Sequence, residues 1–483
     1  MSGTRESSGG HNGGRPGGLW RTVRSFAYGT PLYRYMLAGR VPDRIAAVPS
    51  DSWPGNSDHG RMILEGRFSL LGHVVLLSDD PRDPDAWVPE NATGDWQAAL
   101  NGFGWLRDLR HVGGDMARRR ARELVADWTD RYNDWDSFAW EADILGERIA
   151  NWIGHHDFFC ASADDEFRDR FLDSLFRQAR HLGRVAATVG DGAGMVQAAK
   201  GLIYAGTALP EEKGWLTLGR RLLSERLPAQ IMPDGCHASR SPSRHLAVLR
   251  DLIDIRACLR AGGSPVPDAI EAAIERMAAM LRALRHGDGG LALFNGSFEE
   301  GAYAVEHALT QADALGRPLK SARESGFQRV MAGRTLVVMD TGRPPPAGLD
   351  RNAHAGPLAI EMSLGRDRVI VNCGHWAARD SEEDAAWFAA LSATAAHSTL
   401  TVASTNAFTL GPRGGVERGP TRVAVDRKDT LRGVLIDALH DGYRERYGLT
   451  HRRRMFIEGD GGALRGEESP FRAAAHRARL PPG

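Results

Sequence analysis

The segment Asn352–Gly374, NAHAGPLAIEMSLGRDRVIVNCG, is the stretch that decides the fold. Its first half alternates apolar residues with small or polar ones, which is the period of two of a half-buried strand. The turn residues Gly, Arg and Asp follow at 365–367, and the apolar run at 369–371 returns as a partner strand. The segment therefore predicts a β-hairpin, in which Glu361 is expected to face outward.

Two histidines stand immediately before strand-like runs. His354 precedes the hairpin, and His397 precedes the apolar run 399–402 in the segment 393–402, ATAAHSTLTV. If the strands share one sheet, both histidines and Asn372 at the end of the hairpin lie at one end of it. Histidine supplies a nitrogen that titrates near neutral pH or binds a metal. We therefore expect chemistry at this cluster.

Length and composition bound the class of protein. The chain has 483 residues, 42% of them apolar and 25% charged, which suits two or three globular domains. Its 61 basic and 61 acidic residues give a formal net charge of zero. This balance argues against a general nucleic-acid binder.

The termini and the cysteines bear on the compartment. Residues 1–18 are rich in glycine and serine, so we expect a disordered tail, and no apolar signal core is visible there. No run of about 18 apolar residues occurs, so we expect no transmembrane segment. The four cysteines show no paired spacing and are interpreted as free thiols. The chain as written is expected to be cytoplasmic.

The chain changes character near the HGDGG segment at 286–290. Before it, amphipathic helical patterns with short breaks predict antiparallel helix pairs. After it, short β-rich runs between Gly, Pro, Asp and Asn predict an antiparallel sandwich. The runs expected to be strands are Thr335–Met339, Leu358–Ser363, Val369–Val371, Thr399–Ala403, Arg422–Val425 and Val434–Ile436.

These segments resemble the heparinase II/III family of polysaccharide lyases over roughly residues 100 to 468. The matching motifs are His354 with its hairpin, Asn372-Cys373-Gly374, Ala396–Thr399, His440–Tyr443 and His451–Arg453. The resemblance implies an incomplete α/α toroid over residues 19–300 and a β-sandwich over 310–468. It also implies carbon–oxygen lyase action on an acidic, uronate-containing polysaccharide, and family members are often periplasmic.

A second candidate site is the segment Asp234–His245, DGCHASRSPSRH, which precedes a predicted helix. Backbone N–H groups at a helix start favour anions, and Arg240 and Arg244 add carboxylate-binding capacity. His237 adds titratable nitrogen, as does His245. The segment resembles the family motif Asp-Gly-x-x-x-Glu-x-Ser-x-x-Tyr-His, with Arg244 at the tyrosine position and Ser239 at the glutamate position.

Other family positions also differ. The family's Asn-His pair ahead of a helix is replaced by Ala193 and Gly194. In the family's His-x-His-Ala-Asp motif, Asn352 takes the place of the first histidine and Gly356 that of the aspartate. Asn372 replaces an aspartate that helps to bind zinc in some members. A zinc site made of His354, Asn372 and His397 would therefore lack negative charge.

β-Elimination needs a group that neutralises the uronate carboxylate, a base and an acid. One arrangement compensates for the departures from the family pattern: Arg244 binds the carboxylate, His245 or His354 is the base, and His237 or Tyr443 donates the proton. Asn352 completes the catalytic set. Arg240 is a substrate-binding candidate, and so are Asn151 and Trp152 of a family-like Arg-x-x-Asn-Trp helix. The bound partner is an acidic polysaccharide or oligosaccharide, and the oligomeric state is open.

Alternatives stay open for the site and for the function. In one alternative the histidines hydrogen-bond strand ends, and the tryptophans 87, 96, 105, 135 and 140 pack in the core rather than stack on sugars. The chain is alternatively a non-catalytic glycan-binding or envelope-associated protein, or a hydrolase that uses Glu141 and Asp234. Residues 469–483 are expected to be an irregular tail after a truncated sandwich with an unpaired edge.

Overall fold

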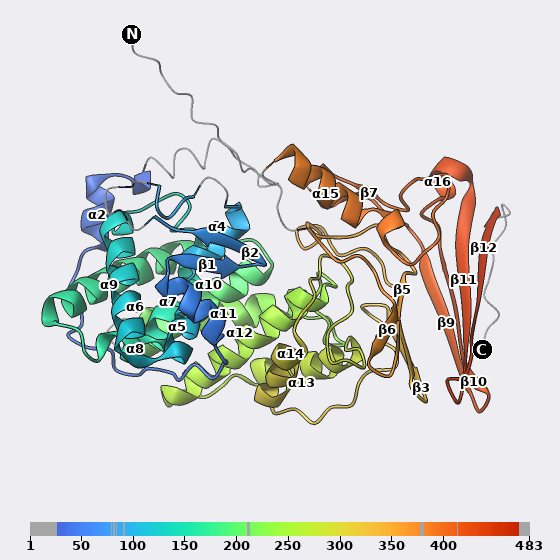
Figure 1. Cartoon of the computed structure of the whole chain (residues 1–483), viewed down its shortest axis with the longest axis horizontal. Coiled ribbons are helices and arrows are strands. Elements are labelled where there is room, and N and C mark those ends of the chain that lie inside the picture. The colour runs from blue at the N-terminus through green and yellow to red at the C-terminus, as the bar shows by residue number, and fades with distance from the viewer. Residues whose placement is uncertain are drawn as a thin grey trace, which may run out of the picture.

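The computed structural model describes residues 27–472, with gaps at 79, 81–82, 84, 90–91, 210–212, 377–380 and 413. Helices form the N-terminal part of the molecule and strands the C-terminal part (Figure 1). The tail expected at residues 1–18 lies outside the described residues, as do residues 473–483. Among the described residues, no helix combines the length and the apolar character that crossing a membrane requires.

The helical domain confirms the predicted change of character, and local signals define its helix ends. Asp164 caps the helix that starts at Asp165 by accepting the Phe167 N–H at 2.8 Å. Ser241 caps the helix that starts at Pro242, a residue suited to the first turn. The elements of the domain are α2 (Pro31–Leu37), α3 (Ser57–Leu64), β1 (Arg67–Leu70), β2 (His73–Leu76), α4 (Gly94–Asn101), α5 (Leu106–Val112), α6 (Gly114–Tyr132), α7 (Ala142–Gly154), α8 (His156–Cys160), α9 (Asp165–Val185), η1 (Ala186–Thr188), α10 (Ala193–Ala208), α11 (Lys213–Gln230), α12 (Pro242–Ala261), α13 (Asp268–Ala283) and α14 (Ala302–Ala312).

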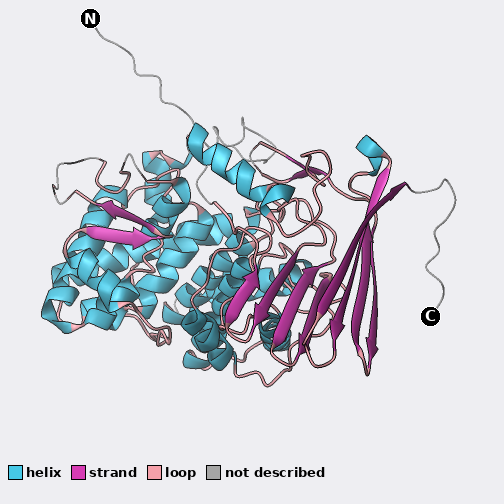
Figure 2. Cartoon of the chain, turned by 45° about the vertical axis from the view of Figure 1, so that its right-hand side comes forward, coloured by secondary structure: helices cyan, strands magenta, loops and turns pink. Residues whose placement is uncertain are grey.

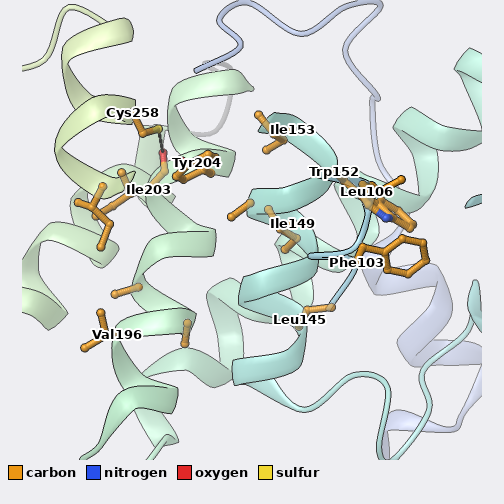
Figure 3. Packing of buried hydrophobic residues seen from close by; sticks show 14 of the residues in the cluster. Phe103, Leu106, Leu145, Ile149, Trp152, Ile153, Val196, Ile203, Tyr204 and Cys258 are labelled. Atoms are coloured by element: carbon orange, nitrogen blue, oxygen red, sulfur yellow. Dashed lines mark hydrogen bonds between the residues drawn. The ribbon is translucent and has the colours of Figure 1, made fainter. Parts of the chain in front are cut away.

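The helix α10 is buried on nearly all sides, between α7, α11 and α12. Figure 3 shows apolar side chains of α7 and α10, among them Ile149, Ile153 and Ile203. The backbones of α7 and α10 approach closely because glycines face each other: a Cβ on Gly201 would lie 2.5 Å from the Cα of Gly146. This packing holds the N-terminal end of α10 in place.

The aromatic residues of the helical domain serve mainly as core. Trp87, Trp96, Trp105 and Trp140 are all buried, which supports the packing alternative for these residues. Arg148 lies fully buried among them, with its guanidinium 4.1 Å from the centre of the Trp128 ring. Its nitrogens donate to Gln178 Oε1 and to the carbonyls of residues 101 and 139, so the charge is solvated by protein dipoles.

The C-terminal part contains two four-stranded antiparallel sheets, which stand face to face in Figure 2. The strand order is β3-β4-β5-β6 in the first sheet and β12-β11-β10-β9 in the second. A two-stranded ribbon, β7-β8, lies outside them. The elements are β3 (Phe327–Ala332), β4 (Thr335–Asp340), β5 (Ile360–Leu364), β6 (Asp367–Ile370), α15 (Glu382–Ser392), η2 (Thr394–Ala396), β7 (Thr409–Leu410), β8 (Val416–Arg418), β9 (Val423–Thr430), β10 (Gly433–His440), α16 (Arg444–Tyr447), β11 (Leu449–Glu458) and β12 (Leu464–Arg472).

The first sheet is buried on both faces, which explains why every residue of β4 is buried. One face packs against the second sheet, where Val337 and Met339 meet Ile436 and Ile457. The other face packs on the end of the helical domain through an apolar cluster that includes Val338, Phe327, Met280 and Phe294. The strands of the first sheet thus form the middle layer of the molecule.

Several strand expectations need correction. The hairpin is confirmed as β5 and β6, but Thr399–Ala403 forms turns with one isolated bridge between Val402 and Thr405. Thr399 Oγ1 donates to the carbonyl of Pro357 at 2.7 Å, and Ala403 has a positive φ of 46°, which ends any extended run. Residues 469–472, expected to be part of an irregular tail, belong to β12 and pair with β11.

Candidate functional site

Three histidines from separate segments form the centre of the site. His354 lies in the loop before β5, His397 directly follows η2, and His375 follows β6. His354 Nδ1 is 2.9 Å from His397 Nε2, and His354 Nε2 is 3.3 Å from His375 Nδ1. The sequence predicted the first two; His375 was missed because it follows the hairpin without a strand pattern of its own.

The hydrogen bonds define the tautomers of this cluster. The backbone N–H of Gly296 donates to His354 Nε2 at 3.1 Å, so that nitrogen carries no proton. His354 Nδ1 therefore carries the proton and donates to His397 Nε2. His397 Nδ1 in turn donates to the carbonyl of Ala393 at 2.8 Å. Burial, with the neighbouring rings, holds the pKa of His354 well below its usual range, so the chain of neutral rings is stable at neutral pH.

Asn372 and Glu361 form a second layer beneath the histidines. The expectation that Glu361 faces outward is wrong: its carboxylate is fully buried and accepts the backbone N–H groups of Leu293 and Asn372 at 3.0 Å each. His286 Nε2 lies 2.9 Å from the other oxygen of Glu361. The carboxylate tolerates burial because these donors replace water. Glu361 thus organises the loop that carries Asn372 and His375.

The residues do not fit the expected zinc set. Asn372 Oδ1 accepts the Ser398 N–H at 3.0 Å, and its amide nitrogen donates to Glu361 at 3.1 Å. Two zinc ligands at about 2.0–2.1 Å in a tetrahedral site lie roughly 3.3 Å apart, whereas His354 and His397 are at direct hydrogen-bonding distance. Within the described ranges, no group of three or more His, Cys, Asp or Glu residues could hold a metal ion.

The second candidate segment lies against the histidine cluster. Asn295 Nδ2 donates to the Arg240 carbonyl, and Asn295 Oδ1 accepts the His354 N–H, both at 3.3 Å. The hydroxyls of Ser241 and Ser297 are 3.1 Å apart. The sequence predicted the two segments but not this connector, residues 295–297, which joins them into one site.

Within this segment, Arg244 differs from its neighbours. Its side chain is exposed, and in the described part of the chain no hydrogen-bond or ion-pair partner is found for its guanidinium. His245 is fully buried, with Nε2 donating to the Met277 carbonyl at 2.9 Å and Nδ1 accepting the His237 N–H at 3.2 Å. Burial lowers the pKa of His245 to about 4. Its expected role as a base therefore does not fit this structure.

His237 is also buried, with Nδ1 2.8 Å from Ser239 Oγ, and among the described residues its Nε2 has no hydrogen-bond partner. Burial, with the nearby Arg244 cation, lowers the pKa of His237 to about 3. At neutral pH the ring is uncharged. It can donate a proton only from the neutral state, which is a weak acid.

Other predicted site residues serve the fold. Arg240 is buried and bonds the Ser325 carbonyl at 2.8 Å, the Arg343 carbonyl at 2.6 Å and the Asp340 carboxylate. Tyr443 is buried, and its hydroxyl donates to the Leu400 carbonyl at 2.8 Å. Trp152 has no exposed surface on which a sugar could stack. The substrate role of Arg240, the acid role of Tyr443 and the sugar-binding role of Trp152 therefore do not fit.

The remaining predicted residues lie partly exposed. Asn151 donates to the Gly102 carbonyl at 2.8 Å within the helical domain. Asn352 is half-buried beside the connector. A Cβ added at Gly296 would lie 2.5 Å from the Cβ of Asn352. At Gly194, one of the positions that replace the family's Asn-His pair, a Cβ would lie 3.1 Å from Asp143 Oδ2. A carboxylate thus lies beside the place from which the histidine of that pair would extend.

Comparison with known proteins identifies the family. Residues 92–315 match the family Heparinase II/III N-terminus, and residues 314–481 match Heparinase II/III-like, C-terminal. The chain therefore belongs to the heparinase II/III family. It is 33% identical over 481 residues to FtsZ-localized protein C of Caulobacter vibrioides (strain NA1000 / CB15N), with 94% of this chain and 80% of that protein covered.

The similarity to enzymes of known activity is weaker. Heparin-sulfate lyase of Bacteroides thetaiotaomicron is 25% identical over 187 residues, which are 35% of this chain and 26% of the lyase. The crystal structure of heparinase III superposes with a TM-score of 0.68 at 16% identity, covering 91% of this chain and 75% of that one. Heparan sulfate lyase HepC from Pedobacter heparinus gives 0.56 at 17%, covering 92% and 75%. These structures establish the fold, a helical toroid followed by a β-sandwich.

Proposed function

We propose that this chain binds a carboxylate-bearing glycan at the Arg244 site without cleaving it. The observation that carries the proposal is the contrast between Arg244 and its neighbours. Arg244 presents an exposed cation. His245 and His354, in contrast, have both ring nitrogens in hydrogen bonds, and Tyr443 is buried. Such a site can hold a carboxylate through a bidentate contact but offers no exposed group for proton transfer.

The relative from Caulobacter supports a cellular setting for this role. That relative is described as FtsZ-localized and aligns with 94% of this chain, whereas the lyase from Bacteroides aligns with 35%. We therefore propose that this chain also localises with FtsZ at the division site and acts there on the envelope. A fluorescent fusion that fails to coincide with FtsZ would remove this part of the proposal.

The second candidate is β-elimination of a uronate polysaccharide. The similarity of the fold to heparinase III supports it. In this candidate Arg244 neutralises the carboxylate, His354 removes the proton next to it, and His237 protonates the leaving oxygen. Before His354 Nε2 could accept the substrate proton, it would have to lose the hydrogen bond that it accepts from the Gly296 N–H. Ala193 and Gly194 take the place of the family's Asn-His pair, so this candidate lacks those two side chains and is the less favoured one.

One experiment separates the two candidates. Purified full-length chain is titrated with heparan, chondroitin, hyaluronan and alginate by calorimetry while ultraviolet absorbance records unsaturated uronate. We expect binding to at least one polymer with no rise in absorbance, and loss of binding in Arg244→Gln but not in Arg118→Gln, an exposed arginine on α6. A rise in absorbance establishes the lyase instead. Absence of binding to every polymer contradicts both.

A further inference from the structure

A cavity opens between the C-terminal ends of α13 and α14 and the edge strand β3. Its volume is about 770 Å³, within the range of ligand-binding pockets. Its lining contains no member of the histidine cluster described above, so it is a separate site. Figure 1 shows α13 and α14 on the side of the first sheet that faces the helical domain. Four arginines line it: Arg282, Arg285, Arg329 and Arg366.

The ion pairs around the cavity leave an excess of positive charge. Arg285 pairs with Glu306 at 2.6 Å, so these two charges offset each other. Asp288 is likewise neutralised, by Arg368 at 2.7 Å. Of the charged residues that line the cavity, this leaves three arginines, at positions 282, 329 and 366, against the single carboxylate of Asp313. The cavity is therefore suited to an anionic ligand.

Two of these arginines are held with unused donors. In the part of the chain that the structure describes, Arg329 Nε is buried without a hydrogen-bond partner, and its two terminal nitrogens lie 3.8 Å from the Met331 sulfur. Burial lowers the pKa of Arg329. Arg282 Nη2 donates to the Ala314 carbonyl at 2.5 Å, while its Nη1 is buried and has no hydrogen-bond partner within the described ranges. An unpaired buried donor is costly, and a bound acceptor would remove that cost.

The wall that carries Arg366 is held in place by its backbone. Gly287 packs so tightly on the Gly365 carbonyl that a Cβ at position 287 would overlap it. The Gly365 N–H donates to the Arg334 carbonyl at 2.7 Å. Arg366 itself is exposed, and in the described ranges its side chain has no hydrogen-bond or ion-pair partner. The backbone that carries Arg366 is thus fixed before a ligand binds, while its side chain is available to one.

The rim of the cavity distinguishes between kinds of anion. Leu315 is fully exposed and Met331 is 64% exposed, so apolar surface lies next to the arginines. The cavity also lies at two helix C-termini, whose partial negative charge disfavours a compact, highly charged phosphate. An extended chain with spaced carboxylates and apolar side chains satisfies both conditions.

We propose that this cavity binds an acidic, partly apolar peptide segment of a protein partner. The arginines bind its carboxylates, and Leu315 and Met331 pack against its apolar side chains. This proposal does not depend on glycan binding at Arg244, because the residues that line the cavity include neither Arg244 nor a member of the three-histidine cluster, although His286 of the lining bonds Glu361 beneath that cluster.

The test uses the full chain and a short fluorescent peptide that alternates glutamate with leucine, read by fluorescence anisotropy. We expect binding that weakens with added salt and falls by about tenfold or more in the double variant Arg329→Gln/Arg366→Gln, since each loses a charge-assisted hydrogen bond. Arg118→Gln is the matched control and should bind as the parent chain does. Arg366→Gln alone, at an exposed position, keeps the test valid if the double variant unfolds.

Two competitors give the contrary outcomes. Equal affinity for the lysine–leucine version of the peptide, or for the Arg366→Gln variant, would overturn the proposal. Displacement of the peptide by inorganic pyrophosphate at lower concentration than by unlabelled peptide would assign the cavity to a small phosphate ligand instead. Retention of peptide binding in Arg244→Gln would confirm that the cavity acts apart from the glycan site.

Discussion

Arg240, in the loop between α11 and α12, forms a buried ion pair with Asp340 at the end of β4. Both side chains are more than nine-tenths buried, and Arg240 also bonds the carbonyls of Ser325 and Arg343. One side chain of the helical domain thus ties three segments of the sandwich. The arginine expected to bind substrate instead joins the two domains.

Substitution of Arg240 by methionine should cost about 3–5 kcal/mol of unfolding free energy, because Asp340 is left buried without its partner. Urea denaturation of the full chain measures this difference. Arg118→Met, at an exposed position of α6, should change the free energy by less than about 0.5 kcal/mol. A loss in Arg240→Met no larger than in the control would show that the pair does not hold the domains together.

His354→Phe should destabilise the chain by about 2–4 kcal/mol, because Gly296 N–H and His397 Nε2 both lose their partner. If the chain still folds, glycan binding at Arg244 should persist, since the ring is buried. Thermal unfolding and calorimetric binding are both measured, with His73→Phe as the exposed control. Loss of binding with unchanged stability would place His354 in contact with the ligand.

Stability should fall as the pH drops below about 6.5. Burial lowers the pKa of His237 to about 3, of His245 to about 4 and of His440 to about 3. Between those values and the ordinary value near 6.5, the unfolded chain binds protons that the folded chain does not, so unfolding becomes more favourable as pH falls. Each histidine contributes a slope of about 1.4 kcal/mol per pH unit.

Urea denaturation at a series of pH values between about 7 and 5 tests this slope. His440→Gln should reduce this slope by about 1.4 kcal/mol per pH unit, the contribution of one histidine. Glutamine can replace the hydrogen bonds to Gly442 and His451 but does not titrate. The exposed His111→Gln serves as the substitution control. A free energy of unfolding that stays constant over this range would contradict the prediction.

Gly146→Ala should destabilise the helical domain by about 2 kcal/mol or more, because the new Cβ would overlap the Gln197 carbonyl of α10. Gly214→Ala is a matched control on α11, where a Cβ would meet no atom of the described residues within 4 Å. It should be neutral or stabilising by up to about 1 kcal/mol. Equal melting temperatures for the two variants would show that α7 and α10 can move apart at little cost.

The sequence predicted the architecture well because most elements obey their local period. The helices α9, α12 and α13 and the hairpin β5–β6 all show regular apolar spacing and have recognisable turn or cap residues. The sequence does not predict the strand β11, LTHRRRMFIE, because two of its buried positions hold the polar residues His451 and Arg453. Their polar atoms are satisfied by Glu468 of β12, a long-range contact that no local pattern reveals.

The candidate site was predicted only in part, for a similar reason. His354, His397 and Arg244 were found from motifs, and the structure brings their segments together. The connector at 295–297 lies in a stretch without strand or helix periodicity, so nothing local marked it. The sequence predicts an outward-facing Glu361 because a period of two assumes that one face of the sheet is exposed to solvent. The first sheet is instead buried on both faces.

The apolar cluster beneath the first sheet determines whether the two family regions can be separated or recombined. Cys236, Met280 and Phe294 come from the N-terminal family region and Phe327 and Val338 from the C-terminal one, yet they form one core. A cut near residue 314 would expose that core on both fragments. The two regions match separate family models, but they do not fold as separate units. Recombination between relatives should therefore succeed only when both sides of this cluster are exchanged together.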